Sequence, residues 1–245
     1  MAQPKVFKGI GVVHAKPKSK PAAPLRDLGD VEQLKVAHRS NSMTWKQNRR
    51  PGGGNLARLD TLEGADLTVQ MQEWTPENQA MVLQGKIVEL EAETVTGEAI
   101  VLQPGGLCVL EFPGATSITI TETAGSTPVA LSAVEVTAAG VRVPADSTVI
   151  TAPTPCTIAY TSTVATRIEP LVEAGEEYYL VFDGLNEADS NRPCIVEVWR
   201  WKAPPAEELA LIDTGNPGKL LAKGEMLADP SRPADESPFY HVTWL

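Results

Sequence analysis

The residue types that most often catalyse reactions or bind metals are sparse in this sequence. The three histidines, His14, His38 and His241, lie far apart and show no metal-ligand spacing. Neither the Gly-x-Ser-x-Gly turn of serine hydrolases nor the His-Glu-x-x-His pattern of zinc proteases occurs. The sequence therefore predicts a protein that is not an enzyme and that needs no metal and no cofactor.

Three carboxylates gather in the segment FDGLNEADS, at Asp183, Glu187 and Asp189. Oxygen ligands at this density are able to hold a cation, but their spacing differs from that of an EF-hand loop. Asp side chains also favour turns, because they hydrogen-bond to nearby backbone groups. A turn rich in capping carboxylates is therefore the simpler interpretation.

The stretch RRPGGGNLARLD at residues 49–60 looks at first like a phosphate-binding loop. A P-loop needs Gly-x-x-x-x-Gly-Lys-Ser/Thr between a strand and a helix, so that backbone N–H groups surround the phosphates. No Lys-Ser or Lys-Thr follows here, and the downstream segment alternates like a strand. The glycines then indicate a mobile hairpin tip, and Arg49 and Arg50 remain available to bind an acidic surface.

The composition is that of a globular protein, and it argues against a nucleic-acid-binding surface. Of the 245 residues, 42% are hydrophobic, which is enough for a sizeable core. The formal net charge is -10, whereas surfaces that bind nucleic acid need clustered Lys and Arg. Lys and Arg gather in residues 1–58, and acidic residues dominate after residue 60. This uneven charge suits head-to-tail contacts between copies of the chain.

Cysteine use and hydropathy indicate a soluble cytoplasmic protein. Cys108, Cys156 and Cys194 are far apart and form no Cys-x-x-Cys pair, so neither a disulfide framework nor a zinc site is predicted. No run approaches the ~18 apolar residues of a membrane span. The N-terminal segment lacks the apolar core of a secretory signal, and no membrane anchor is expected.

Alternating side chains predict a long β-hairpin around the glycine stretch. Residues 28–38 place Leu34 and Val36 on one face, and residues 65–74 alternate in the same way. One face of such a hairpin packs on a core and the other meets water. The polar face is predicted to contain Gln33, Lys35, Thr68, Gln70 and Gln72.

A short helix is predicted over residues 75–85. Thr75 is able to cap its first turn, and Pro76 suits the first helical position. Gly85 is a natural stop. The expected apolar stripe consists of Ala80, Met81 and Leu83.

The predicted fold class is mainly β, a β-sandwich or barrel with a long hairpin, one short α-helix and a β-rich insertion. Residues 95–166 are dense in Thr, Val, Gly and Pro, with turn signals at roughly the ten-residue spacing of a small sandwich. Residues 1–27 are rich in Lys and Pro and are expected to form an extended arm. The main β domain is then expected at 28–94 and 167–245.

Two tryptophans in the segment PCIVEVWRWK are candidates for a binding surface. Trp199 and Trp201 lie two residues apart on a predicted strand, so they are expected to share a face. They are interpreted first as core or subunit-interface residues, because buried aromatics supply a large apolar area. The alternative is an exposed platform that stacks on a sugar.

Several segments follow one another in an order that is more specific than any one of them. Before the insertion, the order is LGDVEQLKV, then RRPGGGNLARLDTLEGADLTVQMQEWTPENQAMVLQG, then VTGEAIVL. After the insertion, the order is YYLVFDGLNEADSNRPCIVEVWRWKAPPAEELALI, then EMLADPSRP, then YHVTWL. This order resembles that of the tail tube (major tail) proteins of long-tailed bacteriophages. The resemblance covers residues 28–100 and 165–245.

The resemblance implies a structural virion protein. Members of that family form rings, usually hexamers, which stack into a hollow tube, and each subunit adds strands to a continuous inner β-barrel. Genomic DNA passes through the lumen into the host without specific binding. The implied partners are other copies of the chain and further tail proteins such as the tape measure and the tail terminator. Assembly in the host cytoplasm and a final location in the phage tail are also implied.

The resemblance assigns two roles to the predicted hairpin. Its polar face lines the lumen, and neutral polar side chains there do not hold DNA tightly, because tight binding requires neutralisation of phosphates. Its loop reaches the neighbouring ring. The lumen-facing residues are predicted to be Gln33, Lys35, Thr68, Gln70 and Gln72, and the inter-ring loop to be Arg49, Arg50, Pro51, Gly52, Gly53, Gly54 and Asn55.

Two other classes of protein remain open. One is a β-sandwich binding or decoration module, for carbohydrate or for a capsid or tail surface. The carbohydrate-binding form is expected to be monomeric and to expose an aromatic platform. The other is a β-rich enzyme, for which the sequence offers no nucleophile–base pair and no metal group.

Overall fold

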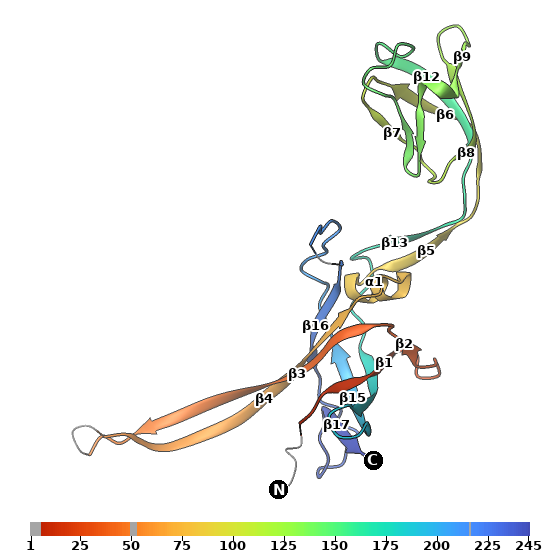
Figure 1. Ribbon diagram of the computed structural model, residues 1–245. Helices are drawn as coiled ribbons and strands as arrows, with labels where there is room; N and C mark the ends of the chain where they lie inside the picture. Colours follow the sequence, from red (N-terminus) through yellow and green to blue (C-terminus); the bar gives the residue numbers. More distant parts are fainter. Residues whose placement is uncertain (1–5, 50–52, 216) are drawn as a thin grey trace. The chain divides into compact units, whose positions relative to one another are not determined.

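The computed structural model describes residues 6–49, 53–215 and 217–245, and these fall into two compact units. Unit 1 combines the residues up to Lys86 with Ile168–Leu245, and unit 2 is Ile87–Arg167. Strands dominate both units, and α1 (Pro76–Leu83) is the only α-helix in the described ranges (Figure 1). The expectation of a mainly β chain with one short helix is confirmed.

Unit 1 is built on an eight-stranded antiparallel sheet to which both halves of the chain contribute. The strand order is β2-β1-β14-β15-β16-β4-β3, and β17 pairs with β15 outside this order. The order ends at β2 and β3, so the sheet is not closed into a barrel. The strands are β1 (Gly9–Pro17), β2 (Arg26–Asp27), β3 (Val31–Lys46), β4 (Asn55–Met71), β14 (Tyr178–Asn186), β15 (Arg192–Lys202), β16 (Leu220–Met226) and β17 (Tyr240–Trp244).

The core of unit 1 forms from alternate residues of these strands. Leu67, Val69 and Met71 of β4 are fully buried, as the alternation predicts. Trp201 of β15 is also fully buried, and its indole N–H donates a hydrogen bond to the Leu67 carbonyl at 3.2 Å. The cluster also includes Val13, Ala15, Leu28, Ala65, Val82, Leu180, Val198, Leu220, Ala222 and Met226.

The N-terminal segment is not wholly an extended arm. Residues 9–17 form β1, which pairs along its whole length with β14. Val13 and Ala15 are buried in the unit 1 core, while His14 and Lys16 alternate with them. The short apolar alternation of β1 was hidden by the Lys- and Pro-rich residues that follow it, so the expected arm at 1–27 is corrected to a strand over this part.

Helix α1 starts as predicted but ends and packs differently. The Thr75 hydroxyl accepts a hydrogen bond from the Asn78 backbone N–H at 3.2 Å. The left-handed residue that ends the helix is Gln84, with φ 49°, and not Gly85. The fully buried residues are Asn78 and Val82; of the expected stripe, Met81 is half-buried and packs against the unit 1 core. Asn78 replaces apolar packing with hydrogen bonds to Arg26, to the Leu28 carbonyl and to the Glu73 carbonyl.

Unit 2 is a small sandwich with its own core. A three-stranded sheet, β10-β11-β7, and a four-stranded sheet, β6-β12-β8-β9, share a buried cluster that includes Leu102, Ile120, Val141 and Ile158. The unit starts earlier than the expected boundary at 95. The reason is that β5, where the chain enters the unit, pairs with β13, where the chain leaves it. The strands are β5 (Lys86–Leu90), β6 (Thr94–Leu102), β7 (Leu107–Val109), β8 (Thr116–Glu122), β9 (Pro128–Val129), β10 (Glu135–Thr137), β11 (Gly140–Arg142), β12 (Thr154–Thr161) and β13 (Ala165–Glu169).

Candidate functional site

The β3–β4 hairpin is longer than the sequence pattern suggests. The two strands pair from Val31 opposite Met71 to Lys46 opposite Asn55. Asn55, expected in the loop, therefore belongs to β4, because its pairing with Lys46 continues the ladder. Of the predicted loop, Arg49, Gly53 and Gly54 lie at the tip, whereas Arg50, Pro51 and Gly52 are outside the described residues.

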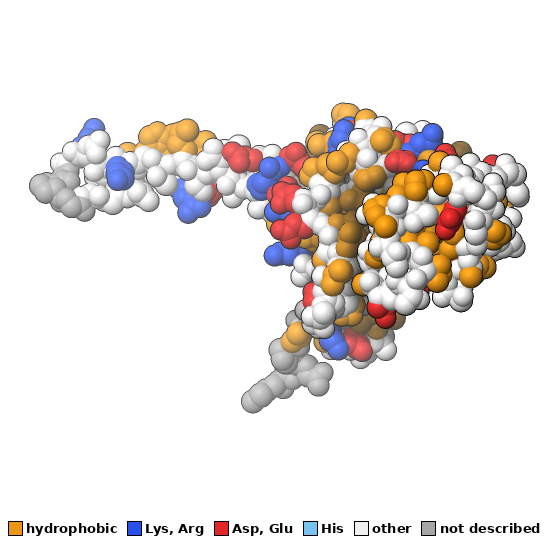
Figure 2. All heavy atoms as spheres, turned by 90° about the horizontal axis from the view of Figure 1, so that it is seen from above, with side chains coloured by type: hydrophobic (Ala, Val, Ile, Leu, Met, Phe, Trp, Pro, Cys, Tyr) orange, Lys and Arg blue, Asp and Glu red, His pale blue; other side chains and the backbone are white. Residues whose placement is uncertain are grey.

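The outer part of this hairpin, residues 40–49 and 53–63, is here called the hairpin arm. Its described side chains are exposed or, at Gln47, half-buried. Met43 lies opposite Leu59, and Trp45 lies opposite Ala57, so these four side chains share one face. Met43, Trp45 and Leu59 are 59%, 45% and 53% exposed. An apolar patch is visible along the arm in Figure 2.

The opposite face of the hairpin arm is mostly polar, although Leu62, opposite Ser40, also lies on it. Ser42 lies opposite Asp60, and the Ser42 hydroxyl donates a hydrogen bond to the Asp60 carboxylate at 2.7 Å. Arg58 donates to the same carboxylate at 2.7 Å. These bonds, that from Ser42 first, lower the pKa of Asp60. The face with Met43, Trp45 and Leu59 is thus the more apolar one, and within the described chain it has no partner.

Four of the five predicted lumen-facing residues come together on one face at the root of the hairpin. Gln33 lies opposite Gln70, and Lys35 lies opposite Thr68. Gln72 follows the end of β4; its side chain is exposed, and its backbone N–H donates to the Asp30 carbonyl at 2.8 Å. The opposite face of β4 is buried in the core. The alternation of side chains along β3 and β4 explains why these four residues share a face. That this face lines a lumen stays a prediction.

This polar sheet face also contains charged residues that the sequence analysis did not include. Thr68 lies between Lys35 of β3 and Lys223 of β16 in the sheet register. Nearby, Arg39 forms ion pairs with Asp66 and with Glu225. The face is therefore mixed in charge and not neutral. Every second residue of β16 is exposed. This alternation is the sequence signal that could have placed Lys223 and Glu225 on an exposed face.

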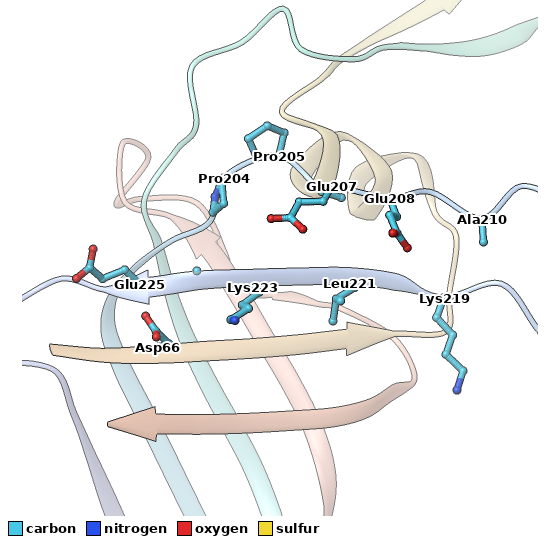
Figure 3. Close-up of a pocket in the computed structure, with 12 residues that line it drawn as sticks. Asp66, Pro204, Pro205, Glu207, Glu208, Ala210, Lys219, Leu221, Lys223 and Glu225 are labelled. Atoms are coloured by element: carbon cyan, nitrogen blue, oxygen red, sulfur yellow. The ribbon is translucent and has the colours of Figure 1, made fainter. Parts of the chain in front are cut away.

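A groove of about 640 Å³ lies beside β16, under the segment that follows β15 (Figure 3). Pro204 and Pro205 begin this segment, and proline has no backbone N–H to continue the ladder with β16. Glu207 and Glu208 line the groove together with Leu221 and Lys223. Among the described residues, neither glutamate has a cation within ion-pair distance.

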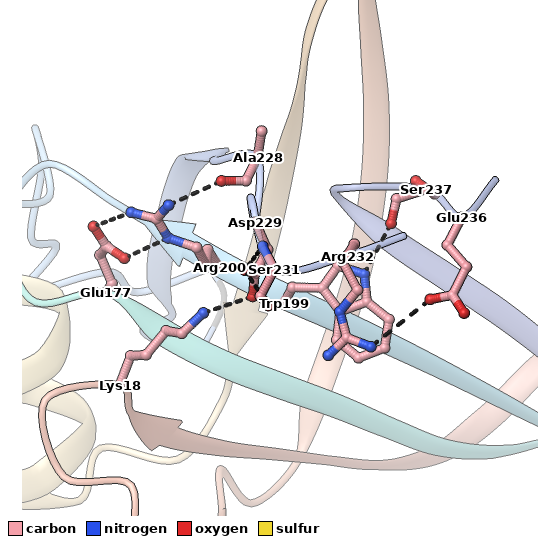
Figure 4. A network of polar contacts seen from close by, with 10 residues as sticks. All are labelled: Lys18, Glu177, Trp199, Arg200, Ala228, Asp229, Ser231, Arg232, Glu236 and Ser237. Carbon is pink, nitrogen blue, oxygen red and sulfur yellow. Dashed lines mark hydrogen bonds and ion pairs between the residues drawn. The ribbon is translucent and has the colours of Figure 1, made fainter. Parts of the chain in front are cut away.

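A buried carboxylate ties the N-terminal segment to the chain that follows β16 (Figure 4). The Asp229 side chain is 9% exposed and accepts hydrogen bonds from Lys18 Nζ at 2.8 Å and from the Ser231 hydroxyl at 2.7 Å. These bonds, that from Lys18 first, hold the pKa of Asp229 well below its ordinary value. Beside it, Arg200 donates two hydrogen bonds to the Glu177 carboxylate and one to the Ala228 carbonyl. The network fixes the segment that leads to β17.

We expect Asp229→Asn to remove a pH-dependent part of the stability of unit 1. A carboxylate whose pKa is lower in the folded state stabilises that state above its unfolded pKa, about 4. That contribution declines as pH falls through the folded pKa. The difference in the free energy of unfolding between wild type and variant, from urea denaturation between neutral pH and about pH 3, will therefore shrink on acidification. A difference that is independent of pH would contradict this assignment.

The two tryptophans of β15 lie on opposite faces, so the expectation of a shared face is wrong. The register between β14 and β15 shifts between Tyr178, opposite Trp201, and Leu180, opposite Val198. This bulge adds a residue to β15, so Val198 and Trp201 both face the core. Trp199 packs on the other side and is 4% exposed.

Trp199 is covered by charged and aromatic neighbours. The Arg232 guanidinium lies 3.6 Å from the centre of the indole, and the His241 ring contacts it edge-on at 4.7 Å. Tyr179 stacks near the same indole, and its hydroxyl donates to Glu197 at 3.0 Å. Since Trp199 and Trp201 are both buried, neither offers the flat exposed platform that a sugar needs.

Three further residues of types that can take part in catalysis or metal binding, His38, Glu187 and Asp189, make local contacts. His38 Nε2 lies 2.9 Å from the Tyr240 hydroxyl. Glu187 forms an ion pair with Lys8 at 2.5 Å. Asp189 lies in a turn, and its backbone N–H donates to the Asn186 carbonyl at 3.1 Å. Within the described ranges, no three His, Cys, Asp or Glu side chains gather in a way that suits a metal ion.

A comparison with protein families matches residues 6–243 to the family described as "Protein of unknown function UCP028589". The chain belongs to this family. No curated protein matches it. The family match includes the hairpin arm, the groove beside β16 and the strands of unit 2. No helix among the described residues of this family member is both long and apolar enough to span a membrane.

Proposed function

We propose that this chain is a structural protein that assembles into rings, of six copies by resemblance, and that the rings stack into the tail tube of a long-tailed phage. The observation that supports this most is the β3–β4 hairpin. At its root it has a buried apolar face and an uncovered polar face, and beyond the root it continues as an arm whose apolar face has no partner. These are the features of a wall built from many copies.

The open edges of the unit 1 sheet support ring formation. The outer edge of β3 is the end of the strand order, so no strand within the described residues pairs with it. Unpaired strand edges promote association with other chains, and closure around a ring removes them. In the proposed ring, the β3 edge meets the sheet of the next subunit, and the polar face with Gln33, Lys35, Thr68 and Gln70 is directed to the lumen.

The hairpin arm supports contact beyond a single ring. An isolated two-stranded hairpin is marginally stable in water, and exposed apolar patches mark interaction sites. Met43, Trp45 and Leu59 form such a patch. We assign the arm to contacts between rings, with genomic DNA passing through the lumen and with the tape measure and tail terminator as further partners in the virion.

The proposal is tested by sedimentation velocity and negative-stain electron microscopy of the full-length chain over a range of concentrations. We expect species larger than a monomer that grow with concentration, and stacked rings with a central channel in the images. A chain that stays monomeric at the highest concentration and binds glycans on an array would overturn the proposal in favour of a binding module.

A decoration role is a second candidate for unit 2. Its separate core supports it, because a sandwich with its own buried cluster is able to fold without contributing to a ring wall. The test is a variant in which a short Gly-Ser linker replaces residues 92–163. If unit 2 serves decoration, this variant is expected to form tubes whose central channel has the same diameter as in the wild type. Loss of ring formation in that variant would instead assign unit 2 to the assembly itself.

A further inference from the structure

We propose that copies of this chain bind head to tail, with the hairpin arm of one copy held by the acidic loop of the next. The acidic loop is defined as residues Pro205–Asp213. This inference rests on the proposed self-assembly and adds to it by naming the surface that receives the arm. The occupant of the loop is a second copy of the chain, and position, charge and apolar surface each argue for it.

The two surfaces lie at opposite ends of the same strands. In the sheet, Leu220 of β16 lies opposite Met71, and Met226 lies opposite Ala65. The acidic loop starts near Glu225, runs alongside β16 and precedes Leu220, so it extends toward the end of β4 marked by Met71. The arm extends from the other end of β4, beyond Ala65. A chain with unlike surfaces at its two ends forms heterologous contacts, which repeat without limit unless they close into a ring.

The charges of the two surfaces are complementary. Lys46 and Arg49 lie at the arm tip, and no carboxylate of the described chain pairs with either. Glu207 and Glu208 point from the acidic loop toward the groove beside β16 (Figure 3). Both pairs of charges thus have no ion-pair partner among the described residues. Complementary charges across an interface direct encounter and select the correct partner.

The apolar residues of the two surfaces are complementary as well. Leu211 and Ile212 of the acidic loop are 77% and 89% exposed. The groove next to them is lined in part by Pro204, Pro205 and Leu221. The apolar face of the arm, with Met43, Trp45 and Leu59, offers a matching surface. Contact between the two sets removes from water the side chains that a monomer leaves exposed.

The arm is long enough to reach another copy. β3 continues past Ser40 to Lys46, and a strand rises about 3.3 Å per residue. The tip therefore lies roughly 20 Å beyond the root of the arm. The arm extends beyond Ala65, whereas the acidic loop runs alongside β16 toward Leu220, so the arm points away from the loop of its own chain. The contact must be made between chains.

Two charge-reversal variants test the pairing directly. The arm variant is Lys46→Glu with Arg49→Glu, and the loop variant is Glu207→Lys with Glu208→Lys. Each variant alone places like charges at every contact, and we expect its association constant to fall at least about tenfold. An equimolar mixture restores opposite charges, because the acidic arm of one variant meets the basic loop of the other. The mixture is expected to form tubes in which the two variants alternate.

Matched controls are Lys20→Glu and Glu91→Lys, which reverse exposed charges outside both surfaces. Tube length in electron microscopy and mass in sedimentation are the readouts, and circular dichroism checks folding. Two results would overturn the head-to-tail pairing and leave the proposed function standing. In the first, the wild type forms tubes and the charge-reversal variants form them equally well. In the second, the mixture forms tubes no better than either variant alone. A wild-type chain that never associates would overturn both.

Discussion

Replacing Trp201 with alanine lowers the free energy of unfolding of unit 1 by about 3–5 kcal/mol, the usual effect of truncating a buried aromatic side chain. Trp201 is fully buried where β15 meets β4 and β16, and Tyr178 packs against its ring. Its indole N–H is the partner of the Leu67 carbonyl, so truncation also leaves that buried carbonyl without this hydrogen bond. The measurement is urea denaturation of dilute protein followed by circular dichroism.

Trp45→Ala is the matched control for that experiment. The side chain of Trp45 is 45% exposed on the hairpin arm, so its loss is expected to change the unfolding free energy by no more than about 0.5 kcal/mol. The same change removes apolar surface from the proposed contact, and tube formation is expected to weaken. Equal destabilisation by the two alanine variants would contradict the division into a buried core and a free arm.

Ile158→Ala has a similarly large effect, confined to unit 2. Ile158 is fully buried between the two sheets of the sandwich, and truncation of such a residue costs about 2–5 kcal/mol. Because units 1 and 2 have separate core clusters, the amides of β12 are expected to lose protection from hydrogen exchange while those of β15 keep theirs. Val109→Ala, at a side chain 68% exposed, is the control. Loss of protection in both units would show that they unfold as one.

The predictable part of this fold is what short-range patterns specify. The alternation of Leu67, Val69 and Met71 identified the core face of β4, and the residue types at Thr75 and Pro76 identified the start of α1. Both signals depend on neighbours within one or two turns of chain. The strand β1 was missed because its alternation is brief and adjoins a segment with the composition of a linker.

The harder part depends on pairings between residues far apart in sequence. The bulge that separates Trp199 from Trp201 exists only in the register with β14, and one added residue reverses every side chain beyond it. Lys223 joins Lys35 on one face because β16 pairs with β4, which no local pattern shows. No role was predicted for the acidic loop, because its place beside β16 depends on the pairing of β16 with β15 and β4.

The discontinuity of unit 1 imposes an order of events during synthesis. Unit 2 is a single continuous stretch, so all of it leaves the ribosome before the second half of unit 1 does. β1 must wait for β14, and the edge of β15 is completed only by β17, near the last residue. Long-range strand pairing of this kind is slow, and domains fold as their chains become complete. The sheet that supports both assembly surfaces therefore matures last, which delays polymerisation until each copy is whole.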